Sequence, residues 1–109
     1  MVQIEKHPGC IQTCLDIMGD KWTALIVRDL SSDKARFGDL EASLDGISPR
    51  TLSQRLDKLE KEQIIVKRLY CERPPRYTYE LTQKGQELQD ILLKMSDWGA
   101  RHRSYQNIA

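Results

Sequence analysis

The hydrophobic residues of this chain change their spacing once, and that change most constrains its fold. Up to about residue 63 the apolar side chains recur at three- and four-residue steps, which is typical of amphipathic helices. Ile64–Tyr70 is rich in β-branched and aromatic residues, and Arg76–Leu81 alternates strictly. After Thr82 the helical period returns. The sequence therefore predicts a mainly α chain with a small β-hairpin, which is an α+β fold class.

Start and stop signals divide the chain into elements. Gly19, Ser31–Asp33 and Asp45–Gly46 each end a periodic run. Ser48 and Pro49 indicate a helix start, because serine can accept a free backbone N–H and proline has none to satisfy. We expect helices at Cys10–Met18, Lys21–Leu30, Arg36–Leu44, Ser48–Gln63 and 83–103, the last capped by Thr82, and strands at Ile64–Tyr70 and Arg76–Leu81 around a Cys71–Pro75 loop.

The order of these elements is that of a winged helix-turn-helix. A short helix, a glycine-containing turn and a second helix over about 36–63 make the helix-turn-helix, and the hairpin at 64–81 makes the wing. One such domain accounts for all of 1–109. No apolar run approaches the roughly 20 residues of a membrane span, and no secretory signal is evident at the N-terminus. We therefore expect a cytoplasmic protein with no membrane partner.

The capped helix presents a polar face suited to the major groove of DNA. With Leu52, Leu56 and Leu59 turned inward, Arg50 and Gln54 lie on the outward line. Arginine can bond bidentately to guanine, glutamine to adenine, and serine or threonine to phosphate or base edges. The alternative is an ordinary solvated surface. The expected DNA-binding residues of this helix are Ser48, Pro49, Arg50, Thr51, Ser53, Gln54, Arg55 and Lys58.

Basic charge is concentrated on this helix and the hairpin. The chain has a net charge of only +1, but Ser48–Arg76 holds eight Lys/Arg and four Asp/Glu, so this stretch carries +4 and the remainder −3. Such clustering can form an electrostatic footprint for a polyanion. Arg73 and Arg76 flank two prolines in the hairpin loop and are expected to contact DNA phosphate or the minor groove. Charges at a strand edge can also serve only to prevent aggregation.

Several runs of residues resemble the HxlR family of bacterial transcription regulators, and they occur in family order. The runs are Leu15–Leu30 (LDIMGDKWTALIVRDL), Arg36–Leu40 (RFGDL), Gly46–Leu56 (GISPRTLSQRL) with Leu59–Glu60, and Pro74–Thr82 (PPRYTYELT) with Gly85. Together they cover about Cys10 to Trp98. The resemblance implies a MarR-like winged helix-turn-helix homodimer that binds double-stranded operator DNA. It also implies regulation, more often repression, and in some members a small-molecule or electrophile effector.

The terminal helices are the expected dimer contacts. In the resembling family the terminal helices pair the subunits, and the last helix here is long for a domain of this size. Its apolar face could also pack within one subunit. The expected interface residues, from helices 10–18 and 83–103, are Ile11, Leu15, Leu88, Leu92, Met95 and Trp98. Two such subunits would read a palindrome with half-sites about 34 Å apart.

Cysteine and histidine residues near the N-terminus leave a second interpretation open. Some family members respond to oxidants through an N-terminal cysteine, but that position falls on Gly9 here, and Cys10 precedes Ile11 instead of the usual proline. Cys10 is therefore a candidate redox-active thiol, and the alternative is that it is an inert thiol near the N-terminus. Cys10 with His7 and Cys14 could alternatively form a thiol- or metal-responsive sensor. No catalytic motif is found, so we expect no enzyme, catalytic residue, bound metal or cofactor.

Overall fold

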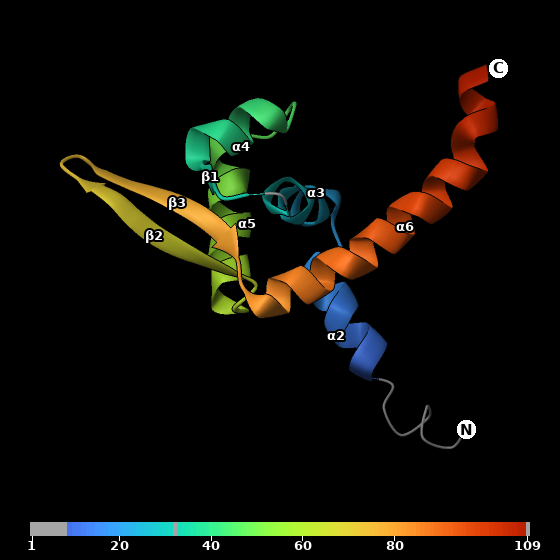
Figure 1. Ribbon diagram of the computed structural model, residues 1–109, viewed down its shortest axis with the longest axis horizontal. Coiled ribbons are helices and arrows are strands. Elements are labelled where there is room, and N and C mark those ends of the chain that lie inside the picture. The colour runs from blue at the N-terminus through green and yellow to red at the C-terminus, as the bar shows by residue number, and fades with distance from the viewer. Residues whose placement is uncertain (1–8, 32, 109) are drawn as a thin grey trace.

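The computed structural model describes residues 9–31 and 33–108, with side chains over 10–31 and 33–103. Its elements form a winged helix-turn-helix, which confirms the predicted fold class (Figure 1). Helices α4 and α5 make the helix-turn-helix, and strands β2 and β3 make the wing. In chain order the elements are α2 (Gly9–Met18), α3 (Lys21–Leu30), β1 (Ala35–Arg36), α4 (Phe37–Ser43), α5 (Pro49–Lys61), β2 (Ile65–Glu72), β3 (Pro75–Leu81) and α6 (Gln83–Ile108).

The hydrophobic core lies where α3, α5 and the base of the sheet meet. Leu52 and Leu59 are fully buried and Leu56 is 2% exposed, so the predicted inner stripe of α5 is confirmed. Ile26 and Val27 of α3 are equally inaccessible. Because one side of α5 is sealed by this packing, its opposite side must face away from the subunit.

The start of α5 is fixed by the capping residues that the sequence predicted. Ser48 is the N-cap, and its Oγ accepts a hydrogen bond from the Thr51 backbone N–H at 3.1 Å. Pro49 occupies the first turn, where a missing N–H costs nothing. Gly46 in the preceding turn has a φ of +89°, a left-handed conformation that favours glycine. These residues set where the exposed helix begins.

The wing is longer and its turn tighter than predicted. Strand β2 continues through Cys71 and Glu72, which pair with Arg76 and Pro75, so the expected five-residue loop is only a turn at Arg73 and Pro74. The register shifts between Leu69 and Cys71, where a β-bulge or irregularity absorbs the mismatch. Pro75 is tolerated because it begins its strand.

The sheet has a third strand that the sequence did not predict. Arg36 was expected to begin a helix, but Ala35 and Arg36 form β1, which pairs antiparallel with Tyr79 and Thr78 of β3. The sheet order is β1-β3-β2. Two residues are too few to show a period, and only the distant partner strand defines this element.

Helix α6 leaves the body of the subunit after its first turns (Figure 1). Its start is seated closely on the wing base, because a Cβ on Gly85 would lie 2.2 Å from the Ile64 carbonyl oxygen. Leu88 is 7% exposed and belongs to the core. The helix extends to Ile108, five residues past the expected end at Arg103. Farther along this helix, Met95 and Trp98 are 55% and 60% exposed.

Candidate nucleic-acid interface

The amino-terminal half of α5 carries an exposed polar surface. Pro49, Arg50, Ser53 and Gln54 are all exposed, and Thr51 is partly buried beside the Ser48 cap. The side chains of Arg50 and Gln54 make no hydrogen bond or ion pair with any described residue. Hydrogen-bonding groups held outward on a rigid helix and left unpaired within the subunit are available to base edges.

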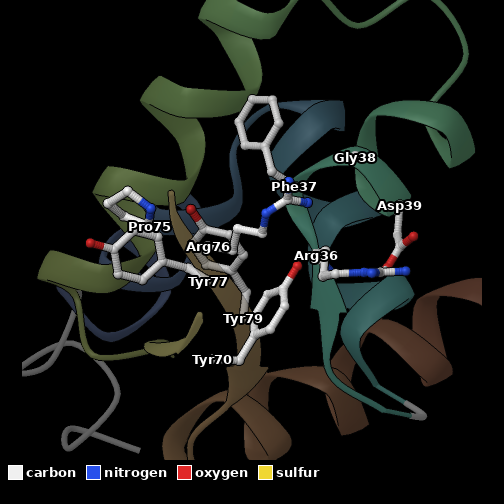
Figure 2. Close-up of a pocket in the computed structure, with 9 residues that line it drawn as sticks. All are labelled: Arg36, Phe37, Gly38, Asp39, Tyr70, Pro75, Arg76, Tyr77 and Tyr79. Carbon is white, nitrogen blue, oxygen red and sulfur yellow. The ribbon is translucent and has the colours of Figure 1, made fainter. Parts of the chain in front are cut away.

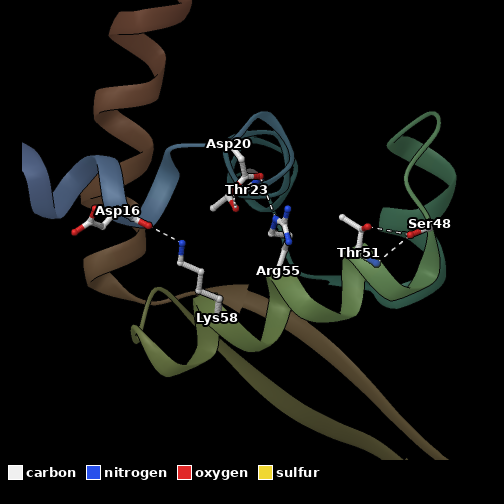
Figure 3. Close-up of polar contacts among 7 residues, drawn as sticks. All are labelled: Asp16, Asp20, Thr23, Ser48, Thr51, Arg55 and Lys58. Atoms are coloured by element: carbon white, nitrogen blue, oxygen red, sulfur yellow. Dashed lines mark hydrogen bonds and ion pairs between the residues drawn. The ribbon is translucent and has the colours of Figure 1, made fainter.

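Arg55 has a partner inside the subunit instead of a free side chain (Figure 3). Its Nε lies 3.2 Å from Oδ1 of Asp20, and its side chain is 30% exposed. The sequence analysis placed Arg55 among the DNA-binding residues, but this ion pair ties α5 to the start of α3. Since Arg55 flanks the buried leucine stripe, its chain is directed back over the subunit.

The carboxylate of Asp20 is a junction for three groups. Burial acts to raise the pKa of Asp20, but hydrogen bonds from the Thr23 backbone and hydroxyl, and then from Arg55, outweigh it and lower the pKa below its ordinary value. The Thr23 N–H donates to Oδ1 at 3.0 Å and the Thr23 hydroxyl to Oδ2 at 2.8 Å. Asp20 therefore caps α3 and holds α5 at once.

Lys58 forms a second polar link from α5 to the N-terminal part of the chain. Its Nζ donates a hydrogen bond to the backbone carbonyl of Asp16, near the end of α2 (Figure 3). Like Arg55, Lys58 was predicted to contact DNA, and the structure gives it an internal contact. These two residues fix the orientation of α5, while Gln54 and Arg50, about one and two turns before Lys58, remain exposed.

The wing adds exposed basic groups beside this face. Arg73 and Arg76 are exposed, and their side chains have no hydrogen-bond or ion-pair partner within the described part of the chain. Lys67 lies over the Tyr77 ring at 4.3 Å, and Arg68 pairs with Glu80 at 3.2 Å. Of the wing arginines, Arg73 and Arg76 are therefore the two without such a partner among the described residues, and their contact with DNA stays a prediction.

Acidic residues limit the interface toward the end of α5. Asp57 and Glu60 lie close enough to the buried phenol of Tyr79 to change its pKa. Burial raises the pKa of Tyr79, and the carboxylates of Glu60 and Asp57 raise it further. Negative charge here repels phosphate, so only the first two turns of α5 are suited to a groove.

A crevice of about 540 Å³ separates the first turn of α4 from the wing (Figure 2). Arg36, Tyr70 and Arg76 line it, from β1, β2 and β3 respectively. The Arg36 guanidinium lies 3.4 Å from Asp39, whose carboxylate also accepts the Arg36 backbone N–H at 3.0 Å. That backbone hydrogen bond is the main cause of a lowered pKa of Asp39. No local sequence pattern marks Arg36 and Tyr70 as site residues, because only strand pairing brings them together.

The candidate dimer residues fall into two groups. Ile11 and Leu15 of α2 are 72% and 52% exposed, and Met95 and Trp98 of α6 are 55% and 60% exposed. Leu92 is partly buried against the core. Leu88 is a core residue, so it cannot present its side chain to a partner as expected. The exposed members remain candidates for a contact between subunits.

The cysteines do not gather into a cluster. Cys10 is exposed, Cys14 is partly buried against the core, and Cys71 donates to the Arg73 carbonyl with 3.7 Å between Sγ and oxygen. His7 lies outside the described residues. Within the described ranges no group of three or more His, Cys, Asp or Glu is placed to hold a metal ion. None of the helices described has the length and hydropathy needed to cross a bilayer.

Comparisons with known proteins agree with the geometry. Residues 17–107 match the family described as HxlR-like helix-turn-helix. The uncharacterized HTH-type transcriptional regulator YvaP of Bacillus subtilis (strain 168) is 40% identical over 98 residues, which cover 90% of this chain and 90% of YvaP. These matches span nearly the whole fold, wing and α6 included.

Solved structures extend the likeness to three dimensions. A transcriptional regulator of the MarR family from Enterococcus faecalis V583 has a TM-score of 0.79 at 30% identity, covering 94% of each chain. The redox regulator HypR in its reduced form has a TM-score of 0.83 at 29% identity, covering 91% of this chain and 98% of HypR. The architecture of α2 to α6 is therefore that of MarR-like regulators.

Proposed function

The chain belongs to the HxlR-like helix-turn-helix family of DNA-binding transcriptional regulators, and from this premise we propose that it is a repressor that binds a palindromic operator as a homodimer. The observation that carries the proposal is the pair of outward, unpartnered side chains on α5, Arg50 and Gln54, beside the free wing arginines. Arg50 reads guanine and Gln54 reads adenine in the major groove. Arg73 and Arg76 contact phosphates next to it.

The remaining residues of α5 position the reading side chains. Ser48 fixes the first turn through the Thr51 N–H, and Ser53 and Thr51 lie near enough to the exposed line to contact phosphate. Arg55 and Lys58 hold the angle of the helix through Asp20 and the Asp16 carbonyl. A helix held at both ends loses little entropy when it enters a groove.

Exposed apolar side chains on α2 and α6 support the proposed homodimer. Ile91, Met95 and Trp98 share one side of α6 at helical spacing and are 46%, 55% and 60% exposed, so they leave an apolar surface there. Large apolar side chains that are exposed together favour contact with another protein surface. Two copies joined there place two recognition helices on one duplex, which matches a palindromic site. Binding near a promoter would then block transcription.

Selection of bound fragments from genomic DNA is the direct test. We expect a shared inverted repeat with half-sites separated by about one helical turn, or a multiple of it, and binding that weakens steeply with salt. Recovery of fragments with no common sequence, or of single half-sites only, would contradict sequence-specific binding by a dimer. A reporter gene placed behind the selected site tells repression from activation. Lower expression when the protein is supplied supports repression, and higher expression contradicts it.

A thiol-responsive function is the second candidate. It is supported by the exposure of Cys10 and by the likeness to a protein named as a redox regulator. If Cys10 senses an oxidant, diamide treatment should change operator binding by the wild type, and Cys10→Ser should abolish that response. Cys14→Ser, on the same helix but partly buried, is the matched control and should keep it. An equal response of Cys10→Ser and the wild type would refute this role.

A further inference from the structure

The crevice between α4 and the wing brings guanidinium groups and tyrosine side chains together outside the exposed face of α5. Arg36 and Arg76 both line it, and the Tyr70 hydroxyl is directed toward the Arg36 side of the same space (Figure 2). Side-chain hydrogen bonding with Tyr70, ahead of Asp39, raises the pKa of Arg36 above its ordinary value. Three distant segments of sequence therefore bring two guanidinium groups and a phenol to one opening.

We propose that this crevice binds a backbone phosphate of the DNA duplex, through the Arg36 and Arg76 guanidinium groups and the Tyr70 hydroxyl. The inference rests on the proposed DNA-binding function and adds a second anchoring point to it, outside the recognition helix. It assigns a ligand contact to Arg36 and Tyr70, and it gives Arg76 a partner on the inner side of the wing.

The chemistry of the lining groups fits a phosphodiester. Arginine offers a planar fork of N–H donors that matches two phosphate oxygens, and a tyrosine hydroxyl can donate to one of them. Among the lining residues, two positive charges stand against the single carboxylate of Asp39. The Arg36–Asp39 pair is exposed, with side chains 58% and 52% accessible, and such pairs hold their partners weakly. A phosphate can therefore share or replace Asp39 as the partner of Arg36.

The position of the crevice suits the same duplex that α5 reads. In Figure 1 α4 and the amino end of α5 lie together, and the wing projects beside them. Arg76 belongs both to the wing surface and to the crevice wall. A duplex that receives the first turns of α5 in its major groove carries a sugar–phosphate strand along the edge of that groove. The opening between α4 and the wing lies where this strand can be held.

The test compares two arginines that differ only in location. Arg36→Gln removes one of the two crevice cations, and Arg28→Gln removes an arginine on α3 that is 57% exposed and pairs with Asp29 at 3.0 Å. The probe is a random-sequence DNA duplex, with affinity measured by anisotropy over a range of salt concentrations. We expect Arg36→Gln to weaken binding about tenfold and to reduce the slope of log K against log salt by about 0.9. Arg28→Gln should change neither the affinity nor the slope.

Failure of the inference can be told from failure of the proposed function. If the wild type shows no salt-dependent binding to DNA, the proposed function itself is refuted. If the wild type binds and the two glutamine variants have equal slopes, only the crevice contact is refuted. Circular dichroism checks that both variants are folded.

Tyr70→Phe tests the hydroxyl contact independently, because this substitution does not change the charge of the protein. It should weaken binding while leaving the salt slope unchanged, because the lost hydroxyl bonds to phosphate without neutralising it. The phenyl ring keeps the packing of the wing. Affinity equal to that of the wild type would show that the hydroxyl does not reach the phosphate.

Discussion

At the scale of single residues, the functional division of α5 depends on which side chains have partners within the subunit. Arg50 and Arg55 are the same residue type, five positions apart on one helix. Arg55 is paired with Asp20, whereas Arg50 makes no such contact with a described residue. Arg55 is already engaged with Asp20, so of these two arginines Arg50 is the one free to recognise a base.

Replacing Arg50 or Gln54 with alanine should weaken binding to the selected operator by about 1–3 kcal/mol and relax its preference at the contacted base pair. The measurement is affinity for the operator and for single-base variants of it. Lys61→Ala, on the same outward line but at the far end of α5, is the control and should retain base preference. Unaltered specificity in both Arg50→Ala and Gln54→Ala would contradict base reading.

Asp20→Ala should destabilise the subunit by about 1 kcal/mol, because α3 loses its N-cap. The pKa of Asp20 is lowered in the folded state, so its stabilisation is present above the ordinary value of 3.8 and is lost as pH falls through the lowered folded-state pKa. Urea unfolding at neutral pH and at about pH 3 measures this. The difference between variant and wild type should shrink in acid, and a difference independent of pH would contradict an ionised cap.

At the scale of elements, the junction of α5, the wing and α6 fixes the wing in place. The Thr82 hydroxyl donates to the Gln63 carbonyl at 2.6 Å and accepts the Gly85 N–H at 3.1 Å. The Thr82 N–H donates to the Ile64 carbonyl at 3.0 Å. One threonine thus caps α6 and ties it to the end of α5. The wing base cannot move without α6, because both are attached here.

Gly85→Ala should destabilise the subunit by about 1–3 kcal/mol or more, since the new Cβ would lie 2.2 Å from the Ile64 carbonyl oxygen, which the Thr82 N–H already holds by a hydrogen bond. Thermal or urea unfolding measures the effect. Gly38→Ala is the matched control, because nothing lies within 4 Å of its added Cβ and helix propensity favours alanine by up to about 1 kcal/mol. Equal stability of the two variants would mean that the Ile64 approach is not tight.

At the scale of the whole molecule, the long α6 is the element that would join the two subunits of the proposed dimer. Its first turns pack against α3 and the core, and its later apolar side chains are exposed. One continuous helix therefore links the wing base to the surface proposed for the second subunit. Because a helix is stiff, the spacing of the two recognition helices is set by this geometry.

Trp98→Glu should convert the proposed dimer to a monomer, because a carboxylate would be buried in an apolar contact. Sedimentation equilibrium measures the mass. Leu69→Glu is the control, since Leu69 is 50% exposed on the wing, distant in the fold from α6, and should leave the mass unchanged. A dimer that persists in Trp98→Glu would exclude this surface, and loss of the dimer in Leu69→Glu would show that the wing takes part.

Local sequence patterns determined most of the fold. The Ser48 cap, the leucine stripe of α5 and the change of period at Ile64 were sufficient for the winged helix-turn-helix, because each involves residues a few positions apart. The outward positions of Arg50 and Gln54 follow from the same spacing. The strand bounds were less well predicted, since Cys71 and Glu72 join β2 only through their partners across the turn.

The tertiary structure alone decided which charged and apolar side chains are left unpartnered within the subunit. Arg55 lies 35 residues from Asp20, and Lys58 lies 42 residues from the Asp16 carbonyl, so no local pattern could reveal either contact. Spacing likewise gave Leu88 and Trp98 the same face, but only packing buries the first and exposes the second. Arg36 reaches the crevice through strand pairing. Periodicity shows which side of an element is polar, whereas long-range contacts determine which residues on that side are free to bind.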